Sequence, residues 1–227
     1  MRGALHVVVT ACAALLIVLA FPWLVPLLAP SLTQLGGEIV GATIFVLVAA
    51  VESRAPDSDL VSSTSPVAKL AHRIALSLRI VRRGHRREFH GPRGLGVYAA
   101  LWIAISLAPL ALGLWWLHEL LRLAAVAACI AFAEHVLQDT VTPRGVGGYR
   151  GFAIEGHSDD EIAAGMILAA LGTYLAARDL LPLHLLGSVD PAALLGLAAM
   201  HAVVPWCWAA AKHGRRPNKG RRRRATA

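Results

Sequence analysis

Six long apolar segments limit what this chain can fold into. A helix needs about 20 residues to cross a hydrocarbon core about 30 Å thick, and segments of this kind recur along the 227-residue sequence. We predict six transmembrane helices, at residues 5–23, 34–52, 97–117, 120–138, 161–179 and 192–211. The alternating short segments of a membrane β-barrel are absent from the sequence. The sequence therefore predicts an all-α, polytopic integral membrane bundle, with residues 1–211 as one embedded domain.

The composition agrees with this class of protein. Apolar residues make up 56% of the chain and charged residues only 16%, whereas soluble domains carry nearer a quarter charged residues. The N-terminal segment has the basic start and apolar core of a signal peptide, but no convincing small-x-small cleavage site follows. We therefore expect the first helix to be retained.

A basic amphipathic segment, residues 67–84, separates the second and third predicted spans. Its apolar residues recur at helical spacing, and they are Val67, Leu70, Ile74, Leu78 and Val81. Lys and Arg residues gather elsewhere around the same predicted helix. The pattern predicts a helix that either lies on the membrane surface or packs against the bundle.

The distribution of positive charge predicts the orientation. Six spans with short connections place both termini on one face, together with the loops 53–96 and 140–160. One of the short connections is a tight hairpin expected at residues 117–119. The face with both termini carries 20 of the 22 Lys and Arg residues. The positive-inside rule places it in the cytoplasm, so we expect a multi-pass protein of the cell membrane with both termini cytoplasmic. The basic tail, residues 212–227, is expected to be disordered and to bind anionic lipid, with nucleic acid the less favoured partner.

Histidine and aspartate residues gather at the cytoplasmic ends of four predicted helices. They are His6, Asp57, Asp59, His85, His90, His135 and Asp139. The i, i+4 spacing of His135 and Asp139 places both side chains on one helix face, where they can hold a single ion. Each element alone is explained at least as well by loops, helix-end ion pairs or lipid contacts. Their convergence on one membrane face predicts a metal site.

The same residues resemble the motifs of a known family. "HRREFHG" (85–91) is similar to an H-R-x-x-T-H-S element, and "HVLQDTVTPRGVGGYRGF" (135–152) to an H-x-x-x-D-x-x-T-x-x-G segment. "PDSD" (56–59) matches P-D-x-D, and His6 matches an N-terminal histidine. Taken in their order along residues 1–152, these elements resemble those of the YdjM-like, LexA-regulated membrane-bound metal-dependent hydrolases. The resemblance implies a polytopic hydrolase distantly similar to zinc phospholipases C and P1-type nucleases, whose sites hold several zinc ions with His and Asp ligands.

The sequence departs from the family pattern at three positions. Phe89 and Gly91 stand where the family usually has Thr and Ser, and Leu60 replaces a histidine often found after P-D-x-D. These changes remove hydrogen-bonding groups or a ligand, which leaves a catalytically silent relative as an alternative.

The residue types suit hydrolysis of a phosphoester in a lipid or lipid-linked substrate. Mixed His and Asp ligands suit two or three zinc ions, with manganese as the rival. Asp57 or Asp139 is expected to bridge two ions, and a metal-activated water would attack phosphorus or an ester carbonyl. Arg86, Arg87 and Arg93 either neutralise the phosphate, with Arg86 in a catalytic role, or only determine topology.

Two other functions are alternatives, of which a transporter would use the same His and Asp residues. A transporter of metal ions or protons would need a polar path across the membrane, and its only candidates are Thr10, Thr43, Ser106 and His201. A non-catalytic membrane scaffold would use the basic tail to recruit a partner. We expect metal-free protein that folds normally if the scaffold reading holds.

Overall fold

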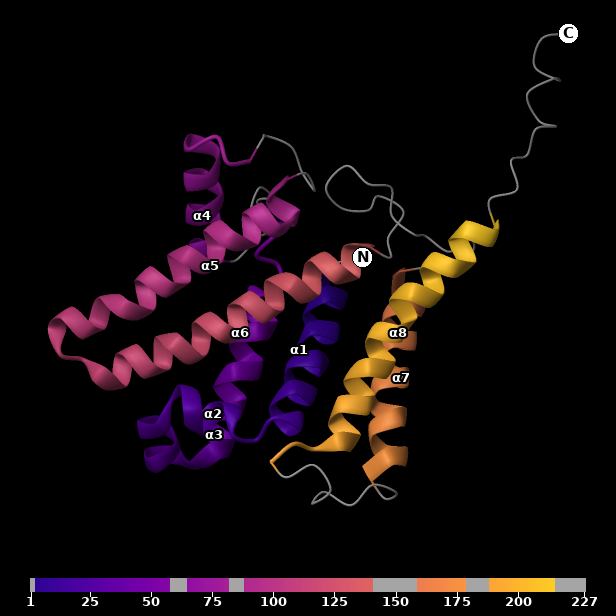
Figure 1. The fold of residues 1–227 in the computed structure, drawn as a ribbon, viewed down its shortest axis with the longest axis horizontal. Helices are drawn as coiled ribbons and strands as arrows, with labels where there is room; N and C mark the ends of the chain where they lie inside the picture. The colour runs from indigo at the N-terminus through magenta and orange to yellow at the C-terminus, as the bar shows by residue number, and fades with distance from the viewer. Residues whose placement is uncertain (1–2, 58–64, 82–87, 141–158, 179–187, 215–227) are drawn as a thin grey trace, which may run out of the picture.

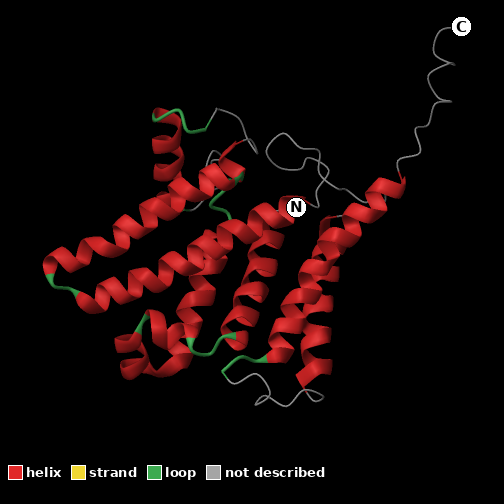
Figure 2. Cartoon of the chain, viewed as in Figure 1, coloured by secondary structure: helices red, strands yellow, loops and turns green. Residues whose placement is uncertain are grey.

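A computed structural model of the chain describes residues 3–57, 65–81, 88–140, 159–178 and 188–214, and these residues form helices and turns without a strand (Figures 1 and 2). In chain order the elements are α1 (Gly3–Ala20), α2 (Leu24–Leu28), α3 (Pro30–Glu52), α4 (Pro66–Ser77), the 3₁₀ turn η1 (Glu88–His90), α5 (Pro92–Leu107), the 3₁₀ turn η2 (Ala108–Leu112), α6 (Trp115–Thr140), α7 (Asp159–Arg178) and α8 (Pro191–Gly214). The predicted all-α class is therefore confirmed over the described residues.

Three helical segments are long and apolar enough to cross a membrane. They are Pro92–Leu112, Trp115–Asp139 and Glu161–Arg178, and they correspond to the third, fourth and fifth predicted spans. Ala4–Ala20 and Pro191–Ala202 are apolar but shorter. Length and composition thus support a helical membrane protein, and the count of six spans stays a prediction.

The predicted span at 34–52 is interrupted at Gly37. This residue takes φ 73° and ψ 172° inside α3, a backbone conformation open essentially to glycine alone. The regular helix after the break, from Glu38 to Glu52, is about 22 Å long at 1.5 Å per residue. That length falls short of a hydrocarbon core of about 30 Å.

The hairpin between α5 and α6 lies earlier than the predicted position at 117–119. Gly113 takes the left-handed conformation, φ 70°, at the end of η2, and α6 begins at Trp115. Residues 117–119 are consequently helical. Glycine adopts this conformation without a Cβ clash, so the turn forms at Gly113, in the sequence "ALGLWW".

Helix α6 forms the centre of the bundle. Its alanines enter two apolar clusters, one shared with α4 and α5 and the other with α1, α2 and α3. A third cluster joins α1, α7 and α8. Small residues allow helix backbones to approach closely, which explains how one helix contacts so many neighbours.

The N-terminal part of α6 holds the corner between α2 and α3. Glu119 accepts hydrogen bonds from the Ser31 backbone N–H at 2.7 Å and from its hydroxyl at 3.1 Å. Arg122 donates to the backbone carbonyls of Leu27 and Leu28 at 2.6–2.9 Å. Backbone groups left unpaired by helix ends are thereby satisfied.

Helix α4 packs against the bundle and ends earlier than the predicted 67–84 segment. The buried face is made of Ala68, Ala71 and Ala75, which join the cluster around α5 and α6. Its first turn is capped by Ser65, whose hydroxyl accepts the Ala68 N–H at 3.0 Å. Of the two alternatives, packing on the bundle is therefore observed, mainly through the alanines, with Val67 and Val81 also in contact with the cluster.

The 3₁₀ turn η1 and the start of α5 are in close contact. A Cβ atom at Gly94 would lie 1.9 Å from the carbonyl oxygen of Phe89, which no side chain could tolerate without a backbone shift. Phe89 is buried, and its ring contacts the rings of His72 in α4 and Phe132 in α6. The position of the next residue, His90, thus depends on Gly94 and Phe89.

We expect Gly94→Ala to lower the free energy of unfolding by about 1–3 kcal/mol, the usual cost of overpacking. Gly96→Ala is the matched control, because a Cβ there meets no atom within 4 Å and alanine stabilises a helix interior by about 0.5–1 kcal/mol. Thermal unfolding of both variants in one detergent measures the difference. Equal stability would contradict the close contact at Gly94.

Candidate metal centre

Five buried side chains from four parts of the chain meet at one end of the bundle. His6 lies near the start of α1, Asp57 follows the end of α3, His90 ends η1, and His135 and Asp139 lie in the last turns of α6. Asp57 is the most exposed of the five residues, at 7%. Segments up to 133 positions apart in sequence therefore contribute to a single site.

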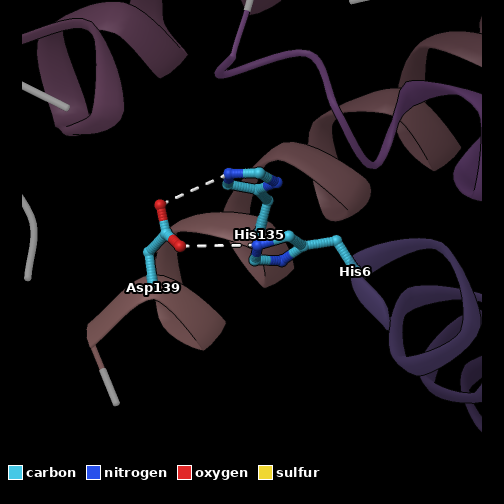
Figure 3. A group of neighbouring side chains, drawn as sticks. All are labelled: His6, His135 and Asp139. Carbon is cyan, nitrogen blue, oxygen red and sulfur yellow. Dashed lines mark ion pairs between the residues drawn. The ribbon is translucent and has the colours of Figure 1, made fainter. Parts of the chain in front are cut away.

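The imidazole Nε2 atoms point toward the two carboxylates. Asp139 lies with one oxygen 3.4 Å from Nε2 of His6 and the other 3.4 Å from Nε2 of His135, as Figure 3 shows. Nε2 of His90 lies 3.2 Å from Oδ1 of Asp57 and 3.9 Å from Oδ2 of Asp139. Nε2 of His135 also lies 3.7 Å from Oδ1 of Asp57. Each of the five residues thus directs a ligand-type atom toward at least one other member of the cluster.

These separations match those between ligands of one ion. Zinc binds nitrogen and oxygen at about 2.0–2.2 Å, which places neighbouring ligand atoms of a tetrahedral site about 3.3–3.6 Å apart. The four distances among His90, His135, Asp57 and Asp139 run from 3.2 to 3.9 Å. The 3.2 Å contact of His90 with Asp57 is also a hydrogen bond, whereas the other three distances, 3.4–3.9 Å, are longer than a good hydrogen bond. The spacing therefore suits a cation between these atoms.

The opposite nitrogens of two imidazoles are held by acceptors. Nδ1 of His6 donates to Oε1 of Gln138 at 2.8 Å, and Nδ1 of His135 donates to the backbone carbonyl of Ser53 at 2.6 Å. A neutral imidazole that carries its proton on Nδ1 has a lone pair on Nε2. Both Nε2 atoms are buried without a hydrogen bond among the described residues. Metal-binding histidines typically show this pattern.

Gln138 is itself fixed in one orientation. Its amide nitrogen donates to the hydroxyl of Thr10 at 3.1 Å, so its oxygen faces His6. The His6 ring also stacks on that of His135, with centroids 3.9 Å apart and planes at 18°. The rings are thus constrained by both hydrogen bonds and packing.

The ligand atoms form two overlapping groups. One consists of His6, His135 and Asp139, and the other of Asp57, His90 and His135. A single Nε2 lone pair binds one ion, so His135 can serve only one group at a time. Asp139 directs one oxygen toward His6 and the other toward His135 and His90, which is the geometry of a carboxylate able to bridge two ions.

The charge of the site favours a divalent cation. Burial raises the pKa of Asp57, but the hydrogen bond from His90 and the nearby His135 ring outweigh it and leave the pKa at about 2. Asp57 is therefore ionised at neutral pH. Two buried carboxylates need compensating positive charge, which one divalent ion would supply.

The structure brings together five of the seven predicted ligands. The other two, Asp59 and His85, lie outside the described residues, as do Arg86, Arg87 and Leu60. Arg93 is described and is exposed on the first turn of α5.

Two groups that orient the ligands were missed by sequence reasoning. Gln138 lies one turn after His135 in "EHVLQD", on the same side of the helix, and this spacing was the only signal of its role. Nothing in the sequence indicated the carbonyl of Ser53, because a backbone acceptor carries no residue signature. Phe89, a departure from the family pattern, anchors the turn that presents His90.

Comparison with protein-family models, curated proteins and solved structures finds no match to this chain. The resemblance to the YdjM-like hydrolases therefore stays a prediction that depends on four short motifs.

We expect Gln138→Leu to weaken binding of a divalent metal about 10–100-fold, because the His6 ring loses the acceptor that orients it. Gln138→Glu is the matched control, since a carboxylate also accepts from Nδ1 of His6. Competition against a chromophoric chelator measures both affinities, and thermal unfolding without metal checks the fold. Equal affinity of the Leu variant and the unmodified protein would contradict this role.

Proposed function

We propose that this chain is a membrane-bound, metal-dependent hydrolase that cleaves a phosphoester of a lipid or lipid-linked substrate. The observation that carries the proposal is the convergence of three buried Nε2 atoms and two carboxylates within 3.2–3.9 Å of their neighbours. The ligands are His6, Asp57, His90, His135 and Asp139, with Asp59 and His85 as predicted additions. Zinc suits this set best, in two or three ions, and manganese is the alternative.

The residues divide the chemistry between them. A divalent ion at this site would polarise the phosphoester and supply a nucleophilic water near neutral pH. Asp57 and Asp139 would hold the ions and lie beside the bound phosphoester. Arg86, with Arg87 and Arg93, would bind the phosphate oxygens, because a guanidinium group matches that geometry with two parallel hydrogen bonds.

The position of the site suits a substrate in the membrane surface. The ligands come from the start of α1, the end of α3, the turn before α5 and the end of α6, and these ends lie together near the N-terminus (Figure 1). In the predicted topology these helix ends lie at a membrane face, where lipid phosphates are found. The positive-inside rule would make this the cytoplasmic face of the cell membrane.

A transporter is less well supported. Of the polar residues that a path would need, Thr43 and Ser106 donate their hydroxyl groups to carbonyls of their own helices. Thr10 binds Gln138, and His201 contacts Glu134 at 2.9 Å. Each of these four groups bonds to the backbone of its own helix or to one neighbouring side chain, and the four do not join into a polar path across the bundle.

We expect purified protein to retain zinc or manganese, and the double variant His135→Ala/Asp139→Ala to lose it, because these two residues supply ligands on both sides of the site. Elemental analysis in detergent measures the metal content. His118→Ala is the control, since that imidazole donates to the carbonyl of Ser106 away from the cluster. Well-folded, metal-free protein, even after zinc and manganese are supplied, would contradict the proposal and favour a scaffold.

A bilayer substrate also predicts a dependence on its physical form. We expect phospholipid in mixed micelles to be hydrolysed much faster than a soluble short-chain analogue with the same headgroup, because only the former is presented at the depth of the site. Phosphate or headgroup release, measured for both at equal bulk concentration, makes the comparison. Equal rates would argue against a lipid substrate.

A further inference from the structure

The side of α4 that faces away from the bundle carries both apolar and basic residues. Leu70 and Leu78 are 48% and 66% exposed, and Arg73 between them is also exposed. The alanine face opposite is buried against the cluster that contains Tyr98 and Trp102 of α5. Since α5 belongs to a candidate membrane span, α4 lies beside the first half of that span. Its outer side thus combines lipid-compatible leucines with cationic groups.

The turn that ends α4 has arginine where glycine is favoured. Arg79 takes φ 56°, and among the described residues no other non-glycine residue has a positive φ. The Arg79 N–H donates to the carbonyl of Leu76 at 3.1 Å, and the Ile80 N–H to that of Ala75 at 2.9 Å. These two bonds define a Schellman motif, whose left-handed position is usually glycine. An arginine kept at a strained position points to a use for its side chain.

Two basic side chains, on α4 and on the turn that ends it, lack a partner within the described part of the chain. Within the described part of the chain neither Arg73 nor Arg79 makes an ion pair or a side-chain hydrogen bond. The helix is also connected to the metal centre, because His72 contacts the ring of Phe89, the residue before His90. An anion bound on this side would therefore lie on the element that packs against the site.

We infer that α4 is an interfacial anchor that binds the anionic phospholipid headgroups of the bilayer in which the chain lies. Arg73 and Arg79 contact the headgroup phosphates, while Leu70 and Leu78 enter the upper acyl layer. Exposed leucines beside unpaired arginines are the combination that membrane-surface helices use. The inference depends on the membrane location of the bundle and not on the proposed hydrolysis, so either can fail without the other.

Arg79→Gly separates lipid binding from helix capping. Glycine adopts the left-handed conformation without strain, so we expect the variant to be at least as stable as the unmodified protein in neutral detergent. Its apparent affinity for phosphatidylglycerol, from a thermal-shift titration in that detergent, should fall about fivefold, the effect of one arginine near an anionic surface. Arg79→Lys keeps the charge and should retain most of the affinity. Phosphatidylcholine should give no difference among the three proteins.

Two results would overturn the inference. In the first, Arg79→Gly is less stable in neutral detergent but binds phosphatidylglycerol as tightly as the unmodified protein. Arg79 would then be only a cap that complements the helix dipole. Arg178→Gln removes one positive charge from the exposed end of α7. If Arg178→Gln lowered the affinity for phosphatidylglycerol as much as Arg79→Gly does, the lipid would be responding to the net charge of the protein and not to a site on α4.

Discussion

The interaction on which the structure depends is the contact of Asp139 with imidazoles from three different segments. Its two oxygens lie 3.4 Å from His6 and His135 and 3.9 Å from His90. Buried charge and buried imidazole are unfavourable unless each finds a partner. The start of α1, the end of α6 and the turn η1 must therefore meet, and the apolar packing farther along the helices is compatible with that meeting point.

Helix α6 is anchored to its neighbours by polar groups at both ends and by alanines between them. Near its start Glu119 and Arg122 bind the backbone of the α2–α3 corner, and near its end His135 binds the carbonyl of Ser53. Tyr98 of α5 donates to Glu52, directly before Ser53, at 2.5 Å. The end of α3 is thus held by α5 and α6 together, which fixes the chain just before Asp57.

The sequence predicted those features that depend on local patterns. Apolar length predicted the helices around α5, α6 and α7, and the i, i+4 spacing predicted that His135 and Asp139 share a face. The hairpin position failed because the left-handed Gly113 decides it, and "LHE" resembles a loop only by its polarity. The role of Gln138 depends on its hydrogen bond with His6, 132 positions away in the sequence. A local sequence pattern cannot indicate a contact between residues so far apart. The extent of α4 depends on a Schellman turn with arginine in place of glycine, which composition does not indicate.

The orientation of two imidazoles is the one expected of residues that could hold a metal ion, more than of a cluster of buried polar residues. If the cluster served only packing, each imidazole would be expected to use both nitrogens in short hydrogen bonds. His6 and His135 instead use Nδ1 at 2.8 and 2.6 Å and leave Nε2 at ion-pair distance from a carboxylate. The acceptors Gln138 and Ser53 then act before any ion binds, because they select the tautomer whose lone pair faces the centre. Such preorganisation reduces the entropy lost on binding, and it explains why two neutral acceptors are buried behind the ligands.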